Sequence, residues 1–431
     1  MPALLVGSTG LPQLYLFPGN SMKGLSVLAI STACSISLGF LAKAQPASAA
    51  LESENNNSFA TRQFLPSGTS TVEGELSPGK VDYYTFPSLD AGKLFDARVN
   101  SNTVDPVLGL VDGSGKPQLI NDDRSDFSVL SQLTGTVPTS GSLTFGVSGL
   151  RDLNLAGEHF ESGPYTLSLN TFALPKPSTN ATLVNGNFES GNLTGWTTLG
   201  ENSIETSAFR SSPTQGTYQA LLSTEGASFA DPILEEFLGL EAGSIDSLVP
   251  LPPIRQDTPT IVPPQQPGQS SAIQQTFTAK AGDILSFDWN FLTNEFPNPL
   301  RSSLPDFSFV SISSPSNSIN CLAELAYVFA GTPPGQTCAN TIPTIDLRTS
   351  TTQFFQETGF QTFSYTIPTT GTYTLGIGVT NKFDNFNDSG LLIDNVRLTS
   401  VPDPSTVLSL LGLGGLGCLS VLKRFVLQKL S

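Results

Sequence analysis

The chain has 431 residues and carries 36 acidic against 20 basic side chains, which gives a formal net charge of −16. Such an acidic surface repels nucleic acid and anionic lipid, so we expect no nucleic-acid partner. It suits neutral glycans or cations such as calcium, although acidity also simply keeps an exported protein soluble. With 39 glycines, 32 prolines and no long amphipathic helix pattern, the sequence predicts short strands joined by turns, in a chain long enough for two ordinary domains.

The N-terminal region has the layout of a secretory signal peptide over residues 22–49. Lys23 supplies charge before a mostly apolar stretch at 25–41, and Ala-Ser-Ala at 47–49 provides a small-residue cleavage site. We therefore expect export, with Met22 as a candidate start of translation.

Residues 69–172 predict an antiparallel β-sandwich, because half-apolar segments alternate with turn residues and no helical period separates them. The strands are expected at 81–86, 94–99, 107–111, 143–147 and 165–169.

Five short motifs of this segment occur in one order. They are Asp-Tyr-Tyr-Thr-Phe at 82–86, Ala-Gly at 91–92, Asp-Pro at 105–106, Asn-Asp-Asp at 121–123 and Gly-Pro-Tyr at 163–165. Together they resemble the bacterial pre-peptidase C-terminal domain. That resemblance implies a small jelly-roll-like sandwich appended to a secreted protein, without catalytic residues, in a family whose members bind protein, polysaccharide or calcium.

Several acidic residues of this domain are candidate calcium ligands, because calcium prefers carboxylate oxygens. They are Asp105, Asp112, Asp122 and Asp123, next to Asn121. Aspartate and asparagine are also the default residues of exposed turns, so a purely structural role stays open.

A stiff polar linker at 173–181 leads to a second domain at 182–400. Leu-Val-Asn-Gly-Asn-Phe-Glu-Ser-Gly at 183–191, a tryptophan soon after, and Leu-Leu-Ile-Asp-Asn-Val-Arg-Leu at 391–398 resemble the ends of the galactose-binding-like jelly roll of carbohydrate-binding modules. The resemblance implies that these two segments form neighbouring first and last strands. It also implies a structural calcium held by Glu189 and Asp394, which could instead be ordinary turn and edge residues.

The middle of this domain predicts further strands and one insertion. The strands are expected at 271–277, 284–291, 307–312, 361–367 and 371–379. The insertion spans about 226–270; its residues 231–238 predict a short helix with Asp231 as the N-cap, and its Pro-rich remainder predicts an extended loop.

Cys321 and Cys338 are the two cysteines outside the targeting segments, and we expect them to form a disulfide in an oxidising compartment. The single histidine, His159, leaves no histidine-based catalytic set and no zinc site. Glycosidase chemistry needs only two carboxylates, which this acidic chain could supply, but no motif marks such a pair. The sequence therefore predicts a protein that is not an enzyme, with a glycosidase as the open alternative.

The C-terminus, 401–431, combines Pro402-Asp403-Pro404, an apolar stretch at 407–422 and the basic pair Lys423-Arg424. It resembles the PEP-CTERM sorting signal, although Asp403 stands where that family has Glu. The resemblance implies a transmembrane helix at 407–422, cleavage by an exosortase-type membrane enzyme, and a place at the cell surface, envelope or extracellular matrix. A plain membrane anchor is the alternative.

Two functional hypotheses remain. In the first, the second domain binds glycan or exopolysaccharide through exposed aromatic rings, with Trp196 and Trp289 as candidates, although a place in the buried core is the commoner role for each. In the second, both all-β domains are structural spacers or adhesins that contact proteins and have no specific sugar ligand.

Overall fold

The computed structural model describes residues 48–53, 55–125, 128–177, 180–226, 229–248, 269–295, 306–314, 317–327, 346–381 and 387–400. Most of the signal peptide, most of the Pro-rich loop, Cys338, the Pro-Asp-Pro motif, Lys423-Arg424 and the helix expected at 407–422 lie outside these residues. No helix in the described ranges has the length and apolar character needed to cross a membrane.

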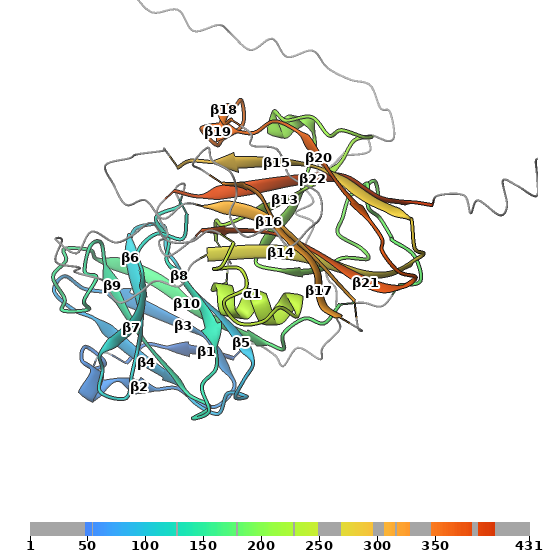
Figure 1. The fold of residues 1–431 in the computed structure, drawn as a ribbon. Helices are drawn as coiled ribbons and strands as arrows, with labels where there is room; N and C mark the ends of the chain where they lie inside the picture. The colour runs from blue at the N-terminus through green and yellow to red at the C-terminus, as the bar shows by residue number, and fades with distance from the viewer. Residues whose placement is uncertain are drawn as a thin grey trace, which may run out of the picture. The chain divides into compact units, whose positions relative to one another are not determined.

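The first group of strands forms two five-stranded sheets (Figure 1). One sheet has the order β1 (Ser48–Leu51), β3 (Thr69–Leu76), β10 (Gly163–Phe172), β5 (Leu94–Asn100) and β8 (Gln132–Thr136). The other has the order β2 (Gln63–Phe64), β4 (Asp82–Phe86), β9 (Leu143–Gly149), β6 (Pro106–Val111) and β7 (Pro117–Asn121). A short 3-10 turn, η1 (Phe59–Thr61), precedes β2.

These two sheets pack face to face as the first sandwich, because apolar side chains from both share one core. Phe145 of β9 contacts Phe86 of β4 and Phe95 of β5 edge-on, with ring centroids 6.0 and 5.9 Å apart. One detail differs from the all-antiparallel expectation: β1 pairs with β3, and β2 with β4, in parallel. Both are short edge strands that precede the sandwich in the chain.

The second group of strands forms two larger sheets. One has the order β11 (Thr197–Leu199), β14 (Gln269–Ala279), β21 (Gly371–Asn381), β16 (Phe307–Ser314) and β17 (Asn317–Tyr327). The other has the order β12 (Glu201–Glu205), β13 (Gln219–Ser223), β22 (Ser389–Thr399), β15 (Ile284–Thr293), β19 (Gln356–Glu357) and β18 (Arg348–Thr349), and β20 (Gln361–Thr366) also pairs with β15. The turn η2 (Ser207–Phe209) lies between β12 and β13.

Strand β15 shows how this second sandwich is built. Trp289 and Phe291 point into the core between the two sheets, which they share with side chains from both. Leu292 points the other way, as the alternation of a strand requires, and packs beneath Phe354 in a smaller cluster. The segment 348–360 therefore covers part of the outer face of this sheet.

The helix expected at 231–238 is confirmed as α1 (Asp231–Leu238), with Pro232 in its first turn and Gly239 ending it at a φ of 68°. Its N-cap is Ala230, however, and Asp231 does not cap the helix. The Asp231 carboxylate instead accepts hydrogen bonds from the hydroxyls of Ser270 (2.6 Å) and Thr380 (2.7 Å). These bonds tie the start of the helix to β14 and β21.

The first strand expected at 183–191 is wrong, since this segment forms turns. Asn185 and Phe188 have φ values of 49° and 55°, which belong to the left-handed region and interrupt an extended strand. The expected proximity to the last strand is nevertheless present: the Val396 N–H of β22 donates to the Gly186 carbonyl at 2.8 Å. A Cβ on Gly186 would lie 2.0 Å from the Val396 oxygen, so only glycine fits this approach.

Candidate functional site

Three of the four acidic candidates of the first sandwich meet at one end of it. Asp105 directly precedes β6, while Asp122 and Asp123 directly follow β7, and these two strands pair antiparallel. One carboxylate oxygen from each of the three lies within 4.8 Å of the others. In the described part of the chain this acidic trio is the one such group of metal-ligating side chains.

The electrostatics of the acidic trio disfavour three negative charges. Burial, followed by the nearby Asp123 and Asp105 carboxylates, raises the pKa of Asp122 to about 6. Burial also raises the pKa of Asp105, with Asp123 and Glu161 adding to the effect. The buried Oδ1 atoms of Asp105 and Asp122 accept no hydrogen bond. A divalent cation would supply the missing positive charge and oxygen partners.

Asp112, the fourth candidate, is not part of the trio. Its Oδ1 accepts hydrogen bonds from the N–H groups of Ser114 (2.8 Å) and Lys116 (3.0 Å), which closes the turn between β6 and β7. Hydrogen bonds from the Ser114 hydroxyl and from these N–H groups lower the pKa of Asp112. Asn121 is likewise engaged, since its Oδ1 accepts from the Gln132 N–H at 2.9 Å.

Glu189 and Asp394 of the second sandwich both accept hydrogen bonds from backbone N–H groups of the loop at 214–218. Glu189 Oε1 accepts from the N–H groups of Thr217 (2.8 Å) and Tyr218 (3.0 Å). Asp394 Oδ2 accepts from the Gln215 N–H at 2.7 Å. The two carboxylates therefore hold one loop from two sides.

Asp288 of β15 belongs to the same arrangement, and sequence reasoning missed it. It lies opposite Asp394 in the β15–β22 ladder, and the Thr214 hydroxyl donates to both, at 2.8 Å and 3.0 Å. Burial raises the pKa of Asp288, but hydrogen bonds from Thr362, Asn395 and Thr214 outweigh burial and lower it. We call Glu189, Asp288 and Asp394 the clamp carboxylates.

The two tryptophans do not form sugar platforms. Trp196 is 7% exposed and Trp289 is 1% exposed, and both belong to the core of the second sandwich. Trp196 stacks on Phe188 at a centroid distance of 5.8 Å, and its indole N–H donates to the Asn185 carbonyl. Their large apolar area is used for packing, so the core role holds for both and neither is placed to stack on a pyranose ring.

Two other residues singled out in the sequence are buried. Cys321 lies on β17 and is fully buried, but Cys338 lies outside the described residues, so their pairing stays a prediction. His159 is 5% exposed, with Nε2 at 2.6 Å from the Lys80 carbonyl and Nδ1 accepting from the Glu161 N–H. Both ring nitrogens thus serve the fold.

A polar pocket of about 500 Å³ lies on the outer face of the β15 sheet, and no sequence motif indicated it. Its lining comes from the loop after η2, from β15, and from the β18–β19 region that Figure 1 shows beside β15. The residues that line it are Arg210, Ser211, Ser212, Asn290, Arg348, Thr349, Thr351, Glu357 and Phe360. Its size lies in the ~300–1,000 Å³ range of small-ligand sites.

Hydrogen bonds hold both walls of this pocket in place. The Thr351 hydroxyl donates to the Arg210 carbonyl at 2.7 Å, which joins the two walls directly. The Gln219 amide donates to the Ser211 carbonyl at 2.6 Å, which anchors one wall to β13. A ligand would therefore meet a largely preformed site.

The chain matches no family model and no curated protein. Among solved structures it is similar to TmCBM61 in complex with beta-1,4-galactotriose (12% identity, TM-score 0.26, covering 52% of this chain and 100% of that one). It is also similar to a non-crystalline cellulose specific carbohydrate-binding module, CBM28 (12%, 0.26, 52% and 97%), and to the CBM22 tandem domain of Paenibacillus barcinonensis Xyn10C (11%, 0.22, 76% and 85%). Its structural neighbours thus include carbohydrate-binding modules. At these TM-scores the likeness carries no argument about a ligand, which must come from the residues of this chain.

Proposed function

We propose that this chain is a non-catalytic exported protein of the cell surface or extracellular matrix that binds glycan through the pocket on the outer face of the β15 sheet. The observation that carries the proposal is the composition of the pocket. A carboxylate, an amide, two guanidinium groups, several hydroxyls and one aromatic ring converge on a single hollow. Sugars offer the complementary surface, since their hydroxyls both donate and accept hydrogen bonds and their C–H faces pack on aromatic rings.

The position of the aromatic ring supports the same reading. Phe360 lines the pocket and is partly buried against the cluster beneath Phe354. The Phe360 ring therefore supplies the aromatic surface of the pocket, whose lining includes neither tryptophan.

Filling the pocket tests the proposal. Ser212 lines it and is exposed, so Ser212→Trp blocks the hollow without removing a described hydrogen bond. Ser77, an exposed residue of the first sandwich, gives the matched control Ser77→Trp. Binding of the purified protein to soluble polysaccharides, including that of the producing cells, is measured by affinity electrophoresis.

We expect the wild type and Ser77→Trp to bind alike, and Ser212→Trp to bind at least about tenfold more weakly, a difference of about 1.4 kcal/mol. If Ser212→Trp bound polysaccharide as tightly as the wild type, the pocket would be excluded as the glycan site. Binding of no polysaccharide by the wild type would reject the proposal and favour the structural spacer or protein-contacting adhesin.

For calcium we propose the acidic trio as the site, because the buried Oδ1 atoms of Asp105 and Asp122 accept no hydrogen bond and the neighbouring carboxylates raise the pKa of Asp122. The clamp carboxylates accept hydrogen bonds from the 214–218 loop, which supports a loop-holding role for Glu189 and Asp394.

Export, the Cys321–Cys338 disulfide, and processing of the C-terminus by an exosortase-type enzyme are proposed from the sequence alone. In this account the membrane contacts the C-terminal helix before cleavage. Intact-mass analysis of the protein recovered from the cell surface, with and without reduction, tests all three: the expected mass lacks residues 1–49 and the C-terminal segment, and reduction adds two hydrogens.

A further inference from the structure

The side chains that line the pocket carry a net positive charge, although the protein as a whole is acidic. The charged side chains of the pocket are Arg210, Arg348 and Glu357, two cations against one anion. The whole chain has 36 acidic and 20 basic residues. Basic residues thus outnumber acidic ones at the proposed glycan pocket, whereas acidic residues outnumber basic ones in the whole chain.

The Glu357 carboxylate is already occupied by protein partners. Its Oε1 accepts from Arg348, at 3.2 Å from Nε and 3.1 Å from Nη2, and its Oε2 accepts from the Asn290 amide at 3.2 Å. Glu357 is 8% exposed. Its charge thus offsets that of Arg348, and few lone pairs remain for a ligand.

Arg210 supplies the charge that is not offset. Within the described part of the chain it forms no ion pair, and its side chain is exposed at the pocket. Its backbone is nevertheless fixed, because its N–H donates to the Ser207 carbonyl and its own carbonyl accepts from Thr351. The φ of Arg210 is 66°, a left-handed conformation that is unfavourable for a residue with a side chain.

We propose that the pocket selects an anionic sugar, a hexuronate whose planar carboxylate is bound by Arg210 beside the Arg348–Glu357 pair. This inference rests on the glycan site proposed above and names the class of its ligand. A guanidinium binds a carboxylate through two parallel N–H···O bonds, a match that a neutral hydroxymethyl group does not offer. The side-chain hydroxyls of Ser211, Ser212 and Thr349, which also line the pocket, are placed to meet the ring hydroxyls of the sugar.

The test compares oligogalacturonate with its methyl ester, which keeps the sugar ring and removes only the charge. Calorimetric titration at 0.15 M salt confines electrostatic effects to about 8 Å, so the overall charge of the protein contributes little. We expect the acid to bind the wild type at least about tenfold more tightly than the ester, the discrimination that one charge-assisted pair supplies.

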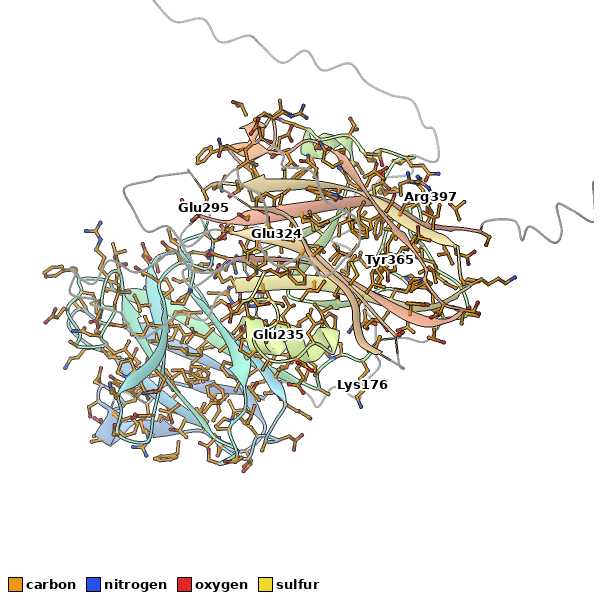
Figure 2. The ribbon with its side chains drawn as sticks, viewed as in Figure 1. Lys176, Glu235, Glu295, Glu324, Tyr365 and Arg397 are labelled. Atoms are coloured by element: carbon orange, nitrogen blue, oxygen red, sulfur yellow. The ribbon has the colours of Figure 1, made fainter. Side chains whose placement is uncertain are left out.

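Two variants assign the discrimination to Arg210. We expect Arg210→Gln to bind acid and ester equally, and Arg397→Gln to keep the wild-type preference. Arg397 is an exposed arginine of β22 in the same sheet, at the end of the sandwich opposite Glu295, and it does not line the pocket (Figure 2).

The outcomes separate this inference from the proposed function. Equal binding of acid and ester by the wild type, lost in Ser212→Trp, would overturn the anionic specificity and leave the glycan site standing. A preference for the acid that survives Arg210→Gln would overturn the role of Arg210. Binding of neither ligand, nor of any polysaccharide in the panel, would overturn both proposals.

Discussion

Each sandwich gathers three carboxylates near a loop, but their surroundings differ. In the acidic trio, the buried Oδ1 atoms of Asp105 and Asp122 accept no hydrogen bond, and each carboxylate lies beside another. The clamp carboxylates instead accept hydrogen bonds from backbone N–H groups and hydroxyls of the 214–218 loop. The same residue types thus give a candidate cation site in one sandwich and a structural fastening in the other.

The titration of individual groups shows how burial and hydrogen-bond donors compete. Burial and the neighbouring carboxylates raise the pKa of Asp122 to about 6. For Asp288, hydrogen bonds from Thr362, Asn395 and Thr214 overcome burial and lower the pKa, whereas at Asp394 burial outweighs its donors and raises the pKa. What a carboxylate does here depends on the donors around it, which residue type alone does not specify.

Removing a clamp carboxylate should have the largest effect. Asp394→Ala leaves the Gln215 and Asn395 N–H groups without their acceptor, while the Thr214 hydroxyl keeps Asp288 as its acceptor. We expect a loss of about 4 kcal/mol in the free energy of unfolding, since each buried donor left unsatisfied costs about 1–3 kcal/mol. Urea unfolding followed by tryptophan fluorescence measures it, because both tryptophans lie in the second sandwich.

Asp394→Asn is the milder variant, because its amide oxygen still accepts. We expect it to lose about half as much. A loss below about 0.5 kcal/mol for Asp394→Ala would show that its hydrogen bonds to the 214–218 loop do not stabilise the fold.

Glu324 on β17 belongs to neither group of carboxylates. Its oxygens accept no hydrogen bond, and burial alone shifts its pKa, so it isolates the effect of burial. Glu324 is fully buried at the position labelled in Figure 2, and this burial raises its pKa to about 8. The folded protein therefore keeps the Glu324 proton at pH values where the unfolded chain has lost it. Stability should fall as pH rises from about 4.5 to about 8, by up to about 1.4 kcal/mol per pH unit.

Glu324→Gln should remove this slope. Between pH 5 and pH 7, the free energy of unfolding of the variant should therefore rise relative to that of the wild type by up to about 3 kcal/mol. Glu236→Gln, at an exposed position of α1, is the control. Parallel stability–pH curves for the wild type and Glu324→Gln would mean that Glu324 is not buried in its protonated form.

Calcium should act on the acidic trio alone. At about 100 times its dissociation constant, calcium should stabilise the first sandwich by about 2.7 kcal/mol. Scanning calorimetry with calcium and with chelator measures the shift in the unfolding transition. We expect Asp122→Asn to abolish the shift and Asp112→Asn to retain it; a shift that Asp122→Asn leaves unchanged would place the calcium elsewhere.

The smallest effect is expected without calcium. Because the pKa of Asp122 is raised to about 6, charging this group opposes folding, and stability should decline as pH rises from about 4 through about 6. Asp122→Asn should flatten this part of the curve in chelator. A wild-type curve that is already flat there would argue against repulsion within the acidic trio.

Much of the fold follows from local pattern. The alternation of Tyr165, Leu167 and Leu169 marks β10, and the apolar run from Ile284 marks β15, because each strand buries one or both faces. The turn at 183–191 was missed, since its left-handed residues are Asn185 and Phe188, and phenylalanine carries no sequence signal for that conformation. Short edge strands such as β1 and β11 depend on partners distant in the sequence, β3 and β14.

The candidate sites could be predicted less completely from the sequence than the fold. Asp105, Asp122 and Asp123 were recognisable because a strand pair brings two acidic turns together. Residues of the pocket were not, since Arg210 and Glu357 are 147 positions apart and belong to no motif. Their meeting depends on the β15–β19 pairing and on the Thr351–Arg210 hydrogen bond, which no local pattern encodes.

The most direct test of the account is a crystal structure of the protein soaked with oligogalacturonate in the presence of calcium. The account predicts sugar density in the pocket with a carboxylate against Arg210. A structure whose sugar lies elsewhere, or whose pocket stays empty at a ligand concentration that saturates binding in solution, would contradict it.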